Sequence, residues 1–114
     1  MFKMLKSGII FIFLLTVGFG QSEVFITEIA DPNNAASARF VELFNIGTED
    51  VDLSVGWKIQ RWTNANPDPT PSSIVDLTGT IPAGGFYILS NNGSAFETMY
   101  GIAADQDIGT GGAA

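Results

Sequence analysis

The chain has 114 residues, of which 46% are hydrophobic, with no cysteine, no histidine and a formal net charge of −7. This length suits one domain of about 100–150 residues and leaves no room for a separate catalytic domain. The missing residue types exclude histidine-dependent triads, cysteine nucleophiles and the common zinc sites.

Residues 1–20 have the three parts of a secretory signal peptide. Lys3 and Lys6 precede an uncharged apolar run over residues 8–19, and small residues follow up to Gly20. The run is shorter than the roughly 20 apolar residues of a transmembrane helix. We therefore expect a leader helix that is cleaved after Gly20, export to the medium or the cell surface, and no transmembrane span afterwards. An uncleaved anchor is the alternative.

The remaining chain is strongly acidic. Without Lys3 and Lys6 it holds three basic and twelve acidic residues, and three minus twelve gives a net charge of −9. Such a surface repels phosphate backbones and anionic lipids, so direct nucleic-acid binding is disfavoured. The charge keeps an exported protein soluble, and it also favours cations or basic partners.

The first half of this chain reads as extended segments. Val24–Ile29 is β-branched and apolar, and Asp31–Asn34 supplies the turn that ends it. Arg39–Asn45 is the next strand, in which Val41 and Leu43 share the face expected to meet the core.

A polar loop and a turn then lead to a tryptophan. Val51–Leu53 precedes Trp57, and Trp57 and Ile59 form an inward pair because strand side chains alternate. Trp62 lies on the opposite face and is expected to be half exposed. Thr63–Ser73 has proline at alternate positions, which predicts a loop.

The second half contains two further strands. Ile74–Leu77 is short, Thr78–Gly85 is a Pro/Gly corner, and Phe86–Ser90 is apolar on both faces and suits a central position, with Tyr87 and Leu89 in the core.

One short helix is expected near residues 94–100. Ser94 and Glu97 fit a capping box, and Gly101 fits the end of the helix. Beyond Asp107 the chain shows neither strand nor helix periodicity.

Four motifs in this order resemble the lamin tail domain family: the "xIxEI" strand, the "FVELYN" strand, the "DLSGW" turn and the "LPAGGYxxL" corner, matched by Phe25–Ile29, Phe40–Asn45, Asp52–Trp57 and Ile81–Leu89. The resemblance spans nearly all of residues 21–114. It implies an all-β, immunoglobulin-like sandwich of the type found on secreted bacterial proteins.

The chain departs from the family pattern in three places. Val55 is an extra residue before Trp57, which predicts a bulge or a longer turn, and Phe44 replaces the family tyrosine. The family continues with strands that close the sandwich, whereas this sequence ends at Ala114. We therefore expect an incomplete sandwich, either a fragment of a longer protein or a domain that borrows strands from a partner.

Calcium is the one metal for which the sequence offers ligands. Asp31, Asn33 and Asn34 form an oxygen-rich loop of the kind that binds Ca²⁺ weakly in extracellular modules, although ordinary turn chemistry explains the same residues. Asp105 and Asp107 resemble the start of an EF-hand loop, but the later acidic ligand and the helices are missing.

Three other groups of residues are candidates for function. Arg61 and Trp62 offer an exposed aromatic ring and a cation for a carbohydrate or peptide, unless the indole only covers the sandwich edge. Residues 92–94 match an N-glycosylation acceptor, but a turn that leads into the helix explains the same residues. Glu28 and Glu42 would approach one another if their strands pair, but strand pairing and solubility explain both without catalysis.

The sequence therefore predicts a non-catalytic binding or scaffolding module of an exported or cell-surface protein, with a protein or cell-surface partner and no required cofactor. In bacterial relatives the domain accompanies nucleases, phosphatases or sorting segments. One alternative is the accessory part of a secreted metal-dependent hydrolase whose catalytic residues lie beyond Ala114, and another is a calcium-stabilised adhesion module.

Overall fold

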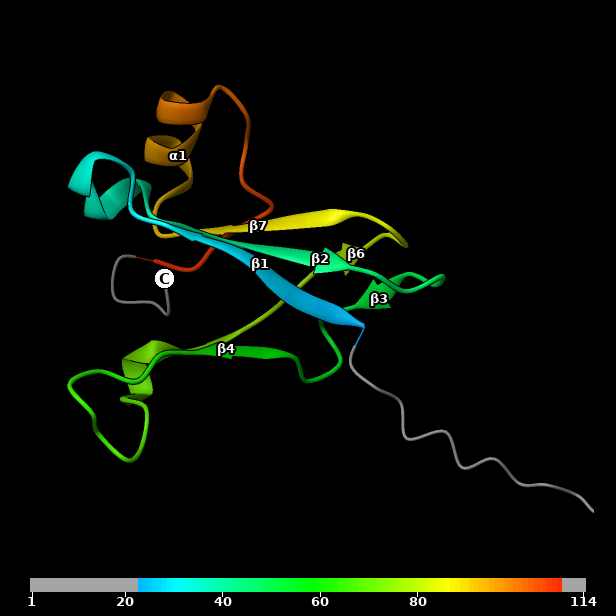
Figure 1. Cartoon of the computed structure of the whole chain (residues 1–114), viewed down its shortest axis with the longest axis horizontal. Coiled ribbons are helices and arrows are strands. Elements are labelled where there is room, and N and C mark those ends of the chain that lie inside the picture. The colour runs from blue at the N-terminus through cyan, green and yellow to red at the C-terminus, as the bar shows by residue number, and fades with distance from the viewer. Residues whose placement is uncertain (1–22, 110–114) are drawn as a thin grey trace, which may run out of the picture.

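The computed structural model describes residues 23–109, which form a β-sandwich with one short α-helix (Figure 1). This confirms the all-β expectation. The predicted leader helix over residues 1–20 lies outside the described residues, and the lack of closing strands stays a prediction. The elements are β1 (Val24–Ala30), η1 (Pro32–Asn34), η2 (Ala36–Ala38), β2 (Phe40–Asn45), β3 (Val51–Asp52), β4 (Lys58–Gln60), η3 (Pro71–Ser73), β5 (Ile74–Asp76), β6 (Thr80–Ile81), β7 (Phe86–Ser90), α1 (Gly93–Tyr100) and β8 (Gln106–Asp107).

The strands form one larger sheet and two strand pairs. The larger sheet has the order β1-β2-β7-β8, and the pairs are β3-β6 and β4-β5. All pairings are antiparallel except β7 with β8. Figure 1 shows β4 in a separate layer, across from β1, β2 and β7. Strand β7 therefore has the central place that its apolar faces predict.

The core lies between these layers. It is a cluster of buried apolar side chains from both of them: Val41, Leu43, Leu53, Ile59, Leu77, Ile81, Tyr87, Leu89 and Ile108. Trp57 packs against this cluster and is only partly buried. Val41 and Leu43 enter the core from β2 because alternate residues of a strand share a face.

The opposite face of β2 is covered at one end by α1. Phe40 makes edge-to-face contacts with Phe96 and Tyr100, each with ring centroids 5.3 Å apart. Such aromatic pairs add about 0.5–1.5 kcal/mol beyond the area that they bury. This aromatic cluster packs the helix against the sheet.

The Pro/Gly corner before β7 is held by Tyr87. Its hydroxyl donates a 2.7 Å hydrogen bond to the Thr78 carbonyl, and burial raises the pKa of the phenol, helped by the negative charge of Asp105. The adjacent Gly79 has φ +75°, and an added Cβ would lie 2.8 Å from the Tyr87 hydroxyl. Only glycine suits this position.

The extra residue Val55 lies in a longer turn. Residues 53–56 form the turn, in which the Trp57 amide donates to the Leu53 carbonyl and Gly56 has φ +94°. The register shift occurs instead in β1, between Ile26 and Glu28.

Some expected boundaries were wrong because tertiary pairing decides them. The corner at residues 78–85 contains β6, which pairs with β3, and the loop at residues 63–73 ends in η3. Strand β8 was not predicted, and Ile108 beyond it is buried in the core. Two-residue strands have no periodicity of their own and form only where a partner strand is present.

The predicted capping box is also wrong. Helix α1 begins at Gly93, and the Asn92 side chain accepts a 2.9 Å hydrogen bond from the Ala95 amide. Asn92 is as good an N-cap as serine and lies two residues earlier, so it takes that role. The helix ends as predicted at Gly101, which has φ +75° and donates to the Glu97 carbonyl.

Asn45, the last residue of β2, connects this strand to the β2–β3 loop and to the end of β6. Its side chain is 0% exposed, and its Nδ2 donates to the carbonyls of Glu49, Ile81 and Pro82 at 2.8–3.2 Å. Its Oδ1 accepts from the Gly47 amide at 2.9 Å. One buried amide therefore connects three segments of backbone.

We predict that Asn45→Asp destabilises the domain by about 3 kcal/mol or more, because a carboxylate replaces the donor that faces three carbonyls. Urea denaturation at neutral pH measures the loss. Asn92→Asp is the matched control, since aspartate also caps helices, and it should change the stability by less than about 0.5 kcal/mol. Equal effects of the two variants would contradict the role of Asn45.

We also predict that Asn92→Ala destabilises the domain by about 0.5–2 kcal/mol, as expected for loss of an N-cap. Ser94→Ala should stay within about 0.5 kcal/mol of the parent, because the Ser94 side chain does not cap the helix. Thermal denaturation compares the two variants. A larger loss of stability for Ser94→Ala than for Asn92→Ala would instead support the predicted capping box.

Candidate binding surface

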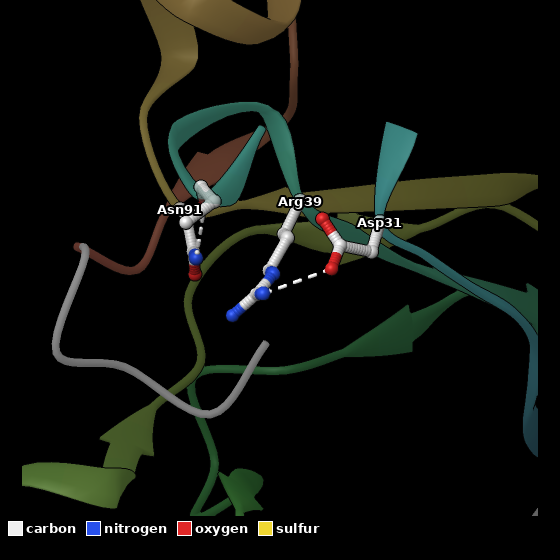
Figure 2. Close-up of polar contacts among 4 residues, drawn as sticks. Asp31, Arg39 and Asn91 are labelled. Atoms are coloured by element: carbon white, nitrogen blue, oxygen red, sulfur yellow. Dashed lines mark hydrogen bonds and ion pairs between the residues drawn. The ribbon is translucent and has the colours of Figure 1, made fainter. Parts of the chain in front are cut away.

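The oxygen-rich loop after β1 has an internal charge partner. Arg39 Nη2 donates a 2.8 Å hydrogen bond to Asp31 Oδ2, and this bond and the charge of Asp31 raise the pKa of Arg39 (Figure 2). Asn33 and Asn34 have φ of +50° and +54°, a conformation in which asparagine is a common turn residue. Asn91 holds the following turn through a 2.8 Å bond to the Ala36 carbonyl.

Calcium at Asp31, Asn33 and Asn34 stays a prediction. A bound ion would share the Asp31 carboxylate with Arg39, which is bonded to Oδ2. Within residues 23–109, no three acidic, histidine or cysteine side chains gather in a way that could hold a metal ion.

The two carboxylates near the end of the described chain bind backbone. Asp105 accepts from the Ile88 amide at 2.7 Å, and Asp107 accepts from the amides of Gly93 and Gly109 at 3.0 and 2.8 Å. These bonds position α1 and β8 on β7. The sequence spacing gave no sign of this structural role.

Arg61 and Trp62 lie just after β4. The Trp62 side chain is 52% exposed, as the alternation predicts, and Arg61 is partly buried with its amide bonded to the Ser73 carbonyl at 3.1 Å. An exposed indole offers a stacking surface. A role for this pair in ligand binding stays a prediction.

Glu28 and Glu42 are directly opposite one another on β1 and β2. Glu42 Oε1 accepts a 2.7 Å hydrogen bond from the Thr27 hydroxyl. Like charges in such cross-strand pairs are destabilising. Neither carboxylate lines the pocket described next.

A groove between β1 and β4 is the surface that sequence analysis missed. It has a cavity volume of about 130 Å³ and is lined by Val24, Phe25, Ile26, Leu43, Trp57, Lys58, Ile59 and Leu77. All but one of these are apolar. Lys58 at its margin is already paired with Asp76.

The β1 side of this groove is open to solvent. Phe25 and Ile26 are 52% and 55% exposed, although both line the groove. Ile29, farther along β1, is more exposed still. Contiguous apolar side chains in water mark interaction sites. The signal in the sequence was the run of apolar residues on both faces of this first strand.

Comparison with known proteins gives one match. The family model described as Lamin Tail Domain matches residues 19–113. No curated protein and no solved structure matches the chain. Within residues 23–109, no helix has the length and apolar character needed to cross a membrane.

We predict that Glu28→Lys stabilises the domain by about 0.2–1 kcal/mol, because it replaces a repulsive cross-strand pair with an attractive one. Glu28→Gln should give a smaller gain. Urea denaturation at low and high salt checks both variants, and the difference between them should shrink with salt. Loss of stability in Glu28→Lys at low salt would show that the two charges do not repel across the strands.

Proposed function

Because the chain belongs to the lamin tail domain family, we propose that it is a non-catalytic binding module of an exported or cell-surface bacterial protein. The family is a non-enzymatic, immunoglobulin-like domain that interacts with proteins. The proposal is carried by one observation, the apolar groove beside β1 with Phe25 and Ile26 exposed at its edge.

The chemistry of the described residues supports a surface that binds without reacting. The groove is apolar, and its one titratable residue, Lys58, is paired with Asp76. General acid–base catalysis needs a titratable group within hydrogen-bond reach of the reacting atoms. No observation in residues 23–109 favours the accessory part of a metal-dependent hydrolase.

Export rests on the pattern of residues 1–20, with Lys3 and Lys6 before an apolar run and small residues up to Gly20. The absence of cysteine means that the exported domain is stabilised by packing and not by disulfides. The twelve acidic residues favour partners with positive charge.

We predict that the full chain, expressed with a C-terminal tag in the cells that produce it, reaches the medium or the cell surface with Gln21 as its first residue. Intact-mass measurement of the recovered chain checks the cleavage. A photo-crosslinking residue at position 25 should capture a protein partner there, whereas the same residue at exposed position 55 should not.

A third crosslinking position, Trp62, separates the surfaces. Capture from position 62 and not from position 25 would support the binding function but place the binding surface near Trp62 instead of at the groove. Retention of the chain inside the cell would contradict export. Absence of capture from both position 25 and position 62 would contradict the binding module.

A further inference from the structure

We infer that the groove between β1 and β4 accepts an extended segment of a partner polypeptide, with alternating apolar and basic side chains, as an added strand beside β1. This inference rests on the proposed function and specifies its partner. It follows from the strand order, the volume and lining of the groove, and the charge around it.

The strand order leaves β1 with room for a neighbour. Strand β1 has seven residues and lies at the end of the order β1-β2-β7-β8, so in residues 23–109 only β2 pairs with it. Strand β4, across the groove, likewise pairs only with β5 in this range. An edge strand presents backbone donors and acceptors to any extended chain, and peptide recognition by strand addition uses them.

The volume of the groove fits an apolar anchor. About 130 Å³ is close to the roughly 150 Å³ of an apolar cavity that holds one benzene ring. One branched or aromatic side chain of a partner would therefore fit against Leu43, Trp57 and Ile59. The next side chain of an extended partner would point away from the groove, because side chains alternate along a strand.

The charge of the module selects a basic partner over a second copy. Arg39 is paired with Asp31, and Lys58 is paired with Asp76. Glu23, Glu28 and Glu42 lie on or beside β1. Two copies, each of net charge −9, repel one another, whereas lysine or arginine on the outward positions of a partner strand is attracted.

The test uses the full chain with Trp62→Phe, so that Trp57 in the groove is the one fluorophore of its kind. The probe is a synthetic peptide of about eight residues that alternates valine and lysine. It should bind with a blue shift of the Trp57 emission, because the inserted valine displaces water. A valine–glutamate peptide and a serine–lysine peptide should each bind at least tenfold more weakly.

Two further changes separate strand addition from charge attraction. N-methylation of alternate residues of the valine–lysine peptide should weaken its binding at least tenfold, because it removes backbone donors. Ile26→Lys in the groove should also weaken binding at least tenfold. Ile46→Lys is the control, because Ile46 is exposed and does not line the groove, yet its substitution adds the same charge.

Several outcomes would overturn the inference. Equal binding of the serine–lysine peptide would show that charge alone attracts the probe. Equal weakening by Ile26→Lys and Ile46→Lys would place binding elsewhere. A peptide-free dimer in sedimentation, lost in Ile26→Lys, would make a second copy the occupant. In the first two cases the binding function still stands if crosslinking captures a partner through position 62.

Discussion

The sandwich depends on a hydrogen-bonded corner at the end of β2, where Asn45 lies opposite Val24 of β1. At this corner one buried side chain, Asn45, donates to carbonyls of the β2–β3 loop, of the last residue of β6 and of the residue after it. Backbone also joins the same segments, because the Asn45 amide donates to the Gly85 carbonyl and its carbonyl accepts from Gly84. A buried polar group is costly unless all of its bonds are made, so this corner has one stable arrangement. The core side chains of both layers then meet in a fixed register.

The neighbouring strand β1 is more exposed. Phe25, Ile26 and Ile29 on β1 are more than half exposed, and the facing carboxylates on β1 and β2 oppose pairing. Natural edge strands usually carry charge or a bulge that discourages uncontrolled pairing, and β1 has both, in Glu28 and in the register shift at that point. These features discourage self-association while the apolar groove remains accessible.

Sequence reasoning predicted the elements whose signal is local. The five-residue β7, the strand through Val41 and Leu43, and the helix ended by Gly101 all follow from periodicity or from the conformational freedom of glycine. It failed where partners distant in sequence decide the structure. Strands β6 and β8 have two residues each and exist through pairing with β3 and β7. The groove was missed for the same reason, since its walls come from segments about thirty residues apart.

The central place of β2 in its sheet has a consequence for the order in which the chain is completed. Strand β2 pairs with β1, which precedes it closely, and with β7, which begins about forty residues later. Contacts between such distant segments form slowly, because loop closure has to come first. A chain made from its N-terminus can therefore form the β1–β2, β4–β5 and β3–β6 pairs first, whereas the four-stranded sheet closes only once Phe86–Ser90 is available.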